Sequence, residues 1–135
     1  MSELEIYIDG AAKGNPGPAG IGVVICEDGL TLKQLSKHIG STTNNVAEYT
    51  ALIYALSEAL ILKAKKIKVW TDSELLYKQL KGEYKVKHQN LKPLFNQIKH
   101  LAGGLVSFEI HHLRREKNKQ ADKLASDAAK NEILR

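Results

Sequence analysis

Four acidic residues stand at positions from which their carboxylates would meet in the folded chain. Asp9 and Asp72 each end a run of alternating apolar residues, and Glu48 and Asp122 lie near the starts of two helical patterns. Four carboxylates in one crevice repel strongly unless cations neutralise them, so their clustering predicts bound divalent metal. Ligands that are all oxygen favour Mg²⁺ or Mn²⁺ over Zn²⁺. Two such ions at one site can activate a water and stabilise the leaving oxygen in phosphodiester hydrolysis.

Each of the four acids also has an explanation that needs no chemistry. Asp9 stands before a glycine, as in an ordinary turn, and Asp72 precedes a serine where a helix cap is expected. Asp122 lies in the first turn or so of the last helical pattern, where an acid favours the helix dipole. Taken singly, the structural explanations are preferred, but the conjunction of acids favours a site.

Glu48 follows Asn45 by three residues, which is the spacing of a variant capping box. It also shares a helical stripe with residues that should face the sheet, namely Leu52, Ala55 and Ala59. A carboxylate at the start of that stripe should point toward the core end of the helix rather than toward water.

The apolar periodicity predicts the elements that must position these acids. Strands are expected over residues 4–9, 22–26, 31–39, 67–72 and 106–110, and helices over 44–60, 73–80, 90–102 and 118–130. The Gly- and Pro-rich residues 11–20 predict a turn-rich connection. Asn118 is expected to cap the last helix, and Cys26, as a strand residue, to pack in the core.

This order predicts an α/β fold with a mixed five-stranded sheet and helices on both faces. The three strands before the first helix are joined by short turns and should be antiparallel, and the two later strands, reached through helices, should add in parallel. Strand 4–9 is the natural centre of such a sheet. The carboxyl ends of strands 4–9 and 67–72, where Asp9 and Asp72 stand, then form the expected ligand crevice.

Composition indicates one soluble domain over residues 1–135. Hydrophobic residues make up 43% and charged residues 26% of the chain, which argues against disorder and fibrous repeats. The longest apolar stretch, 51–62, contains Ser57 and Glu58 and is too short to span a membrane. The acidic N-terminus is unlike a signal peptide, and the single cysteine suits a reducing compartment, so we expect a cytoplasmic protein without a membrane partner.

The charge is unevenly distributed. Lys and Arg number 20 against 15 acids, for a net charge of +5. Residues 63–99 contain ten lysines and only three acids. Such a stretch is able to track a phosphate backbone, and it is equally typical of a solvated face that keeps a small protein soluble.

Four motifs lie in order on the predicted elements. They are Ile8-Asp9-Gly10 followed by Gly14-Asn15-Pro16-Gly17-Pro18-Ala19-Gly20, then Thr42-Thr43-Asn44-Asn45-Val46-Ala47-Glu48, then Thr71-Asp72-Ser73, and finally Asn118-Lys119-Gln120-Ala121-Asp122-Lys123-Leu124-Ala125. Together they resemble the type-1 ribonuclease H family along nearly the whole chain. The resemblance implies a ribonuclease H-like fold and endonucleolytic cleavage of the RNA strand of RNA/DNA hybrids, leaving a 5′-phosphate and a 3′-hydroxyl.

The resemblance also implies roles for particular residues. Asp9, Glu48, Asp72 and Asp122 would hold two Mg²⁺ ions, with Mn²⁺ as a substitute, and Asp9 would bridge both. Substrate-binding positions carry over to Gly10, Ala11, Ala12, Asn15, Thr43, Asn44 and Asn45. Short amides and backbone groups suit this task because they can donate and accept hydrogen bonds with the 2′-hydroxyls that mark an RNA strand.

Three departures make the chain resemble the compact bacterial and archaeal branch of that family. This branch lacks the long basic protrusion, and some of its members also cut double-stranded RNA. The loop before Asp122 has no His. Arg115 fits the Arg found in this loop of shorter members, and we expect it to hold a phosphate. His111 and His112 are expected to be structural or surface residues. Residues 81–88 form a short, lysine-rich segment. Glu74 stands where some relatives have Gln, and it is not assigned to substrate.

A monomeric enzyme is therefore expected. Another nuclease or strand-transfer domain of the same fold is a second interpretation. A non-catalytic module that binds RNA/DNA hybrid or double-stranded RNA is a third, which the presence of all four acids disfavours.

Overall fold

The computed structural model describes residues 3–130. Its elements follow in the order β1 (Leu4–Ala12), β2 (Gly17–Glu27), β3 (Leu30–Thr42), α1 (Asn44–Ile61), β4 (Lys66–Thr71), α2 (Glu74–Leu80), α3 (Lys92–Ala102), β5 (Ser107–His112), the 3₁₀ turn η1 (Arg115–Lys117) and α4 (Lys119–Lys130). The predicted order of strands and helices is confirmed, and the short turn η1 is added to it.

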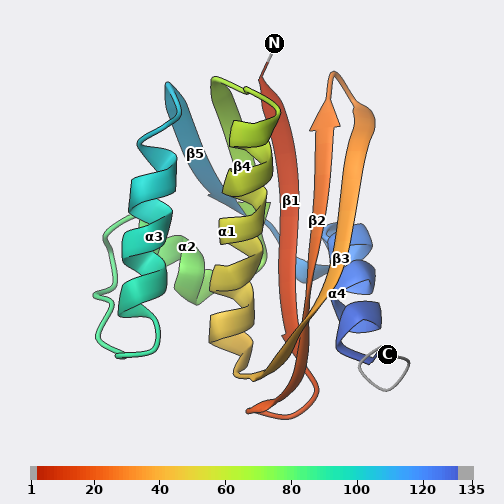
Figure 1. The fold of residues 1–135 in the computed structure, drawn as a ribbon, viewed down its shortest axis with the longest axis vertical. Helices are drawn as coiled ribbons and strands as arrows, with labels where there is room; N and C mark the ends of the chain where they lie inside the picture. The colour runs from red at the N-terminus through yellow and green to blue at the C-terminus, as the bar shows by residue number, and fades with distance from the viewer. Residues whose placement is uncertain (1–2, 131–135) are drawn as a thin grey trace.

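The five strands form one mixed sheet in the order β3-β2-β1-β4-β5. The pairs β1–β2 and β2–β3 are antiparallel, and β1–β4 and β4–β5 are parallel. The predicted topology is confirmed, with β1 at the centre (Figure 1).

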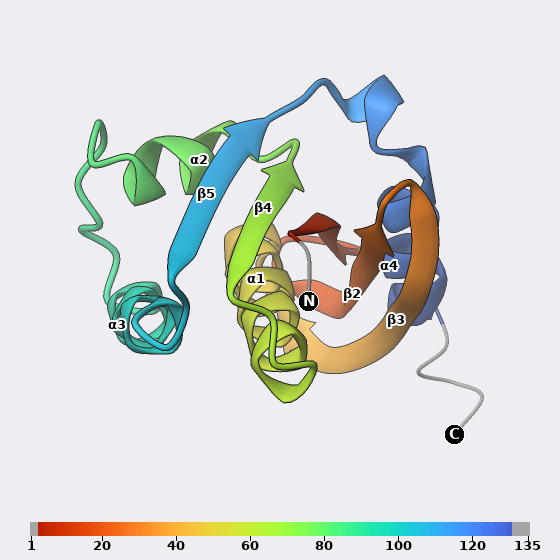
Figure 2. The same cartoon turned by 90° about the horizontal axis from the view of Figure 1, so that it is seen from above.

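Helices cover both faces of the sheet, as expected. α1 packs on β1 and β2 with α3 beside it, and α4 packs on the opposite face against β2, β1 and β3 (Figures 1 and 2). The core between α1 and the sheet is built from alternate strand residues such as Ile6 and Ile8 and from the helical stripe that includes Leu52 and Leu56, all fully buried. The alternation of β1 places Asp9 on the α4 side of the sheet.

The expected turn-rich connection over 11–20 is wrong in extent, because the strands continue into it. Ala11 pairs with Gly20 and Ala12 with Ala19, which leaves only residues 13–16 for the turn. Gly17 serves a close backbone approach, since a Cβ there would lie 2.2 Å from the carbonyl oxygen of Lys13. The third strand is likewise longer than predicted and runs from Leu30 to Thr42.

Cys26 is half-buried, so its expected place in the core is wrong. It pairs with the exposed Glu5 near the end of β2, and its Sγ lies 4.0 Å from the Thr31 hydroxyl. Val106, expected inside the last strand, precedes β5 and is exposed.

Across residues 3–130, none of the helices combines the length and the apolar character needed to cross a membrane.

Candidate functional site

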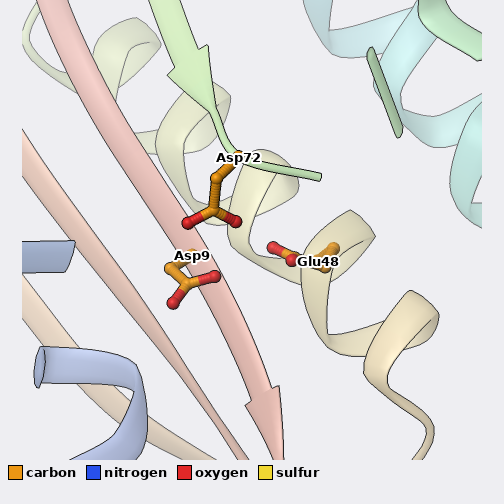
Figure 3. A group of neighbouring side chains, drawn as sticks. All are labelled: Asp9, Glu48 and Asp72. Atoms are coloured by element: carbon orange, nitrogen blue, oxygen red, sulfur yellow. The ribbon is translucent and has the colours of Figure 1, made fainter. Parts of the chain in front are cut away.

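Three carboxylates meet where β1, β4 and α1 approach one another (Figure 3). Asp9, Glu48 and Asp72 each offer an oxygen atom, and these atoms lie within 4.8 Å of one another. The three residues line a cavity of about 410 Å³. The predicted convergence is therefore confirmed for these three acids, which we call the carboxylate cluster.

Asp122 lies beside the carboxylate cluster rather than within it. It occupies the first turn of α4, and its charge contributes to raising the pKa of both Asp9 and Asp72. Its Oδ1 lies 3.8 Å from Nη2 of Arg115. The fourth acid is thus close enough to act on the cluster, and it faces a cation on its other side.

Glu48 is free to point to the carboxylate cluster, because Thr43 caps the start of its helix. The Thr43 hydroxyl accepts the hydrogen bond from the Val46 N–H, so the expected capping box is not formed. Glu48 Oε1 accepts instead from the backbone N–H of Gly10 at 2.9 Å. This contact needs a glycine, since a Cβ on Gly10 would lie 2.3 Å from the backbone of Ala47.

Asp72 is likewise free of a capping role. The hydroxyl of Ser73 accepts from the Leu76 N–H and caps α2. Asp72 Oδ2 accepts from Nδ2 of Asn118 at 3.3 Å, and the same Nδ2 donates to the Ile8 carbonyl at 2.8 Å. The side chain of Asn118 is therefore not the predicted helix cap but a buried link between β1 and Asp72; only its backbone carbonyl accepts from the N–H of Asp122.

The electrostatics of the cluster favour a bound cation. Burial, followed by the charges of Asp72 and Asp122, raises the pKa of Asp9 to about 8. Burial and the charges of Asp9 and Asp72 raise the pKa of Glu48 well above its usual range. Burial also raises the pKa of Asp72, although the Asn118 hydrogen bond and the Arg115 charge oppose this.

Asp9 Oδ2 is buried and has no hydrogen-bond partner within residues 3–130. A buried, unpaired carboxylate oxygen beside two further carboxylates is costly, and a divalent cation would remove that cost. The donors are all oxygen, which suits a hard cation. The residues present therefore fit a metal site.

The amides predicted to bind substrate build the rim of this cavity. Asn44 Oδ1 accepts from the Ala12 N–H at 2.9 Å, and Asn15 Oδ1 accepts from the Asn44 N–H at 3.0 Å. These bonds tie the β1–β2 turn to the start of α1. Gly10, Ala11, Ala12, Asn44 and Arg115 line the same cavity as the carboxylates.

Asn15, Thr43 and Asn45 line a neighbouring cavity of about 410 Å³, whose other wall is the lysine-rich segment with Lys85 and Lys87. The segment is anchored by the buried Gln79, whose Nε2 donates to the Lys85 carbonyl at 3.1 Å and whose Oε1 accepts from the Tyr49 hydroxyl. The predicted substrate residues are thus divided between two adjoining cavities.

Sequence reasoning did not single out Lys13 and Ser126, which also line the carboxylate cavity. Lys13 Nζ donates to the Ser126 hydroxyl at 3.1 Å and so links the β1–β2 turn to α4. Helical spacing offered a signal for Ser126, because it lies four residues after Asp122 and so on the same face of α4.

The remaining polar candidates lie outside the carboxylate cluster, although the charge of His112 is near enough to lower the pKa of Asp72. His111 is paired with Glu109 at 3.0 Å, and Glu74 is exposed and paired with Lys78. His112 packs its ring against Tyr77.

Residues 7–128 match the reverse transcriptase-like family. A bifunctional protein of Mycobacterium tuberculosis is 41% identical over 128 residues, which cover 93% of this chain and 35% of that protein. The ribonuclease HI of Halobacterium salinarum is 39% identical over 126 residues, which cover 93% of this chain and 63% of that enzyme. This chain thus spans less than two thirds of either relative.

A solved ribonuclease H1 isolated from compost, in complex with RNA/DNA hybrid, superimposes with a TM-score of 0.91. It is 45% identical to this chain, and the match covers 98% of this chain and 99% of that one. With the carboxylate cluster, the sheet order and the matched residues all in agreement, this chain belongs to the ribonuclease H family.

Proposed function

We propose that this chain is a metal-dependent endoribonuclease that hydrolyses the RNA strand of RNA/DNA hybrids and leaves a 5′-phosphate and a 3′-hydroxyl. The observation that carries the proposal is the carboxylate cluster of Asp9, Glu48 and Asp72, whose oxygen atoms lie within 4.8 Å of one another in a chain of this family. The hybrid bound to the compost ribonuclease H1 supports the choice of substrate.

Asp9, Glu48, Asp72 and Asp122 would hold two Mg²⁺ ions, or Mn²⁺ in their place, and the ions would supply an activated water and stabilise the leaving oxygen. The chain's own contribution is to hold the carboxylates in place. The Gly10 N–H fixes Glu48, and the Asn118 amide fixes Asp72.

Substrate recognition is assigned to the rim of the two cavities. The 2′-hydroxyls of the RNA strand distinguish a hybrid from duplex DNA, and short amides can both donate to them and accept from them. Asn15, Asn44 and Asn45 would contact minor-groove base edges and sugar hydroxyls, and Thr43 and Asn44 would lie near a phosphate of the DNA strand. The exposed Arg115, 3.8 Å from Asp122, would hold a phosphate of the cut strand.

We further propose that residues 1–135 act as one catalytic domain, as a monomer, in the cytoplasm. All four acids come from one chain. Asp9 lies on β1, Glu48 on α1 and Asp122 on α4, and Asp72 directly follows β4, so the site needs no second copy. The single Cys26 suits a reducing compartment.

The test uses an end-labelled RNA strand annealed to DNA or to RNA, incubated with Mg²⁺, Mn²⁺ or a chelator. Metal-dependent cutting of the hybrid, with the stated end groups, is expected. Asp122→Asn should abolish the cutting, whereas Asp127→Asn, which changes a second acid of α4 that is paired with Lys123 on the surface, should leave it intact.

Cutting of double-stranded RNA as well would keep the chemistry and widen the substrate class. Binding of the hybrid without any cutting, with either metal, would overturn the proposal in favour of a non-catalytic hybrid-binding module.

A further inference from the structure

Part of the sheet face that carries α4 has no helix on it within residues 3–130. α4 packs against β1, β2 and β3, and it lies away from β4 and β5 (Figure 2). On that side the face formed by β4, β5 and part of β1 is open, and the side chains that alternate onto it come from residues such as Lys68, Trp70 and Glu109.

Three rings form a row across this open face, which we call the aromatic row: Tyr7 on β1, Trp70 on β4 and His111 on β5. Tyr7 is the register partner of Trp70, and Trp70 is the register partner of His111. The Tyr7 and Trp70 rings stack with centroids 6.3 Å apart, and those of Trp70 and His111 with centroids 4.7 Å apart. All three side chains are partly exposed.

Because stacked rings cover the faces that they share, the free ring faces lie at the two ends of the row. At the Tyr7 end lies a cavity of about 190 Å³, whose lining residues are Tyr7, Lys117, Asn118, Gln120 and Ala121. Asn118 Oδ1 is buried there without a hydrogen-bond partner in the described chain, and the residue as a whole is 2% exposed. At the other end, β5 is the edge strand, so nothing in the sheet lies beyond His111.

The aromatic row continues directly into the candidate catalytic site. Tyr7 precedes Asp9 by two residues and Trp70 precedes Asp72 by two, so the rings lie roughly 7 Å along the strands from the carboxylates and on the same face. Exposed cations follow β5 at this end, namely Arg114, Arg115 and Lys117.

Most acids near the aromatic row are in ion pairs, and they lie on the side of the row that is further from the carboxylate cluster. Glu109 pairs with His111, and Glu3 lies 3.6 Å from Lys68, one register position further from the carboxylates. Glu5 is the remaining exposed acid there. Rings next to the carboxylates with cations beside them are the features of a stacking platform for unpaired bases.

We propose that the aromatic row binds single-stranded RNA, as the continuation of the RNA strand that crosses the carboxylate cluster. The choice of RNA rests on the proposed function, because the strand at the carboxylates is the strand that is cut. One base stacks on the free face of Tyr7 in the 190 Å³ cavity, another stacks on the free face of His111 at the sheet edge, and Lys117 and Arg114 contact the phosphates beside Tyr7.

The chain provides its own probe, since Trp70 is its single tryptophan. Trp70 emission is followed while single-stranded (rA)₁₀ is added to the full chain in chelator, where cleavage cannot occur. Quenching that saturates is expected. His111→Ala and Tyr7→Leu should each weaken binding by about fivefold or more, as expected for a lost stacking partner.

Tyr54→Leu is the matched control, because this tyrosine lies on α1 on the other face of the sheet and should not change the affinity. Thermal melts establish that each variant is folded, and His111→Ala at the sheet edge serves if Tyr7→Leu does not fold. The proposal is overturned if (rA)₁₀ leaves Trp70 emission unchanged, if both variants bind it as the parent does, or if (dT)₁₀ or a deca-arginine peptide binds more tightly than (rA)₁₀.

The cleavage assay on a blunt hybrid separates this proposal from the proposed function. If blunt hybrid is cut but (rA)₁₀ does not quench Trp70 emission, RNA binding by the aromatic row is contradicted and the proposed nuclease activity stands. If (rA)₁₀ quenches Trp70 emission but no hybrid is cut, the proposed nuclease activity is contradicted. The aromatic row then binds RNA that the chain does not cleave.

Discussion

The backbone N–H of Gly10 donates a hydrogen bond to Glu48 Oε1 at 2.9 Å, which couples the central strand to the first turns of α1. The contact depends on a close approach of the two backbones, since a Cβ on Gly10 would lie 2.3 Å from the carbonyl carbon of Ala47. One glycine therefore fixes both the packing of α1 and the position of a candidate metal ligand.

Gly10→Ala should destabilise the protein by about 1–3 kcal/mol, because the added methyl forces α1 away from β1. It should also weaken stabilisation by Mg²⁺, since Glu48 moves with the helix. Urea unfolding with and without Mg²⁺ measures both effects. Gly103→Ala, where the new Cβ would lie 3.2 Å from the nearest atom, is the control, and equal losses in the two variants would contradict the argument.

Asp9→Asn should stabilise the metal-free protein and abolish its stabilisation by metal. The substitution removes a buried charge that burial and the neighbouring acids disfavour. Hybrid cleavage should fall by about 100-fold or more, because metal-dependent stabilisation of the transition state is worth several kcal/mol. Thermal melts in chelator and in Mg²⁺ test the two stability effects, and a variant that still gains stability from Mg²⁺ would exclude Asp9 as a ligand.

The metal-free protein should lose stability as the pH rises from about 4 to about 8. The folded pKa of Asp9 is about 8 against an ordinary 3.8, so between these values the folded state binds more protons than the unfolded state. The raised pKa of Glu48 acts in the same direction. Urea unfolding in chelator across this range should show the decline, a shallower decline in Asp9→Asn, and a weaker dependence in excess Mg²⁺.

The sheet topology was predictable because local periodicity and connection length determine it. Alternation over 4–9 and 67–72 identifies two of the strands, and the helical crossover that precedes 67–72 favours its addition in parallel to the strand it joins. The stripe of Leu52, Ala55 and Ala59 placed Glu48 toward the sheet, as the structure has it. These signals lie within short windows of sequence.

The unpredicted features depend on contacts between distant residues. An asparagine before a helix is typical of a cap, and only the packing of α4 beside β1 brings Asn118 to Asp72 and Ile8. Lys13 and Ser126 are 113 residues apart. Glycines in residues 11–20 predicted turns, but a Cβ on Gly20 would lie 2.5 Å from the backbone nitrogen of Ala129, so this glycine lets α4 approach the sheet.

Asn118→Ala should cost about 1–3 kcal/mol of stability, because the Ile8 carbonyl loses its buried partner. It should also raise the pKa of Asp72 further, since the Asn118 hydrogen bond opposes the effect of burial there. Weaker stabilisation by Mg²⁺ is then expected in thermal melts. The neighbouring exposed Gln120→Ala should change neither quantity, and an Asn118→Ala protein as stable as the parent would contradict the assigned link.

Arg115→Ala should lower the rate of hybrid cleavage by about tenfold while stability and metal binding stay close to those of the parent. The side chain is 79% exposed and lies 3.8 Å from Asp122, so its removal disturbs little packing, and a surface ion pair contributes under about 1 kcal/mol. A lost charge-assisted contact to a substrate phosphate, by contrast, costs about 1.5–3 kcal/mol. Lys123→Ala is the matched control, since this surface cation is 77% exposed, is paired with Asp127 and lies outside the residues that line the carboxylate cavity. Single-turnover cleavage separates the rate from product release, and equal rates for Arg115→Ala and the parent would show that this arginine does not hold the phosphate.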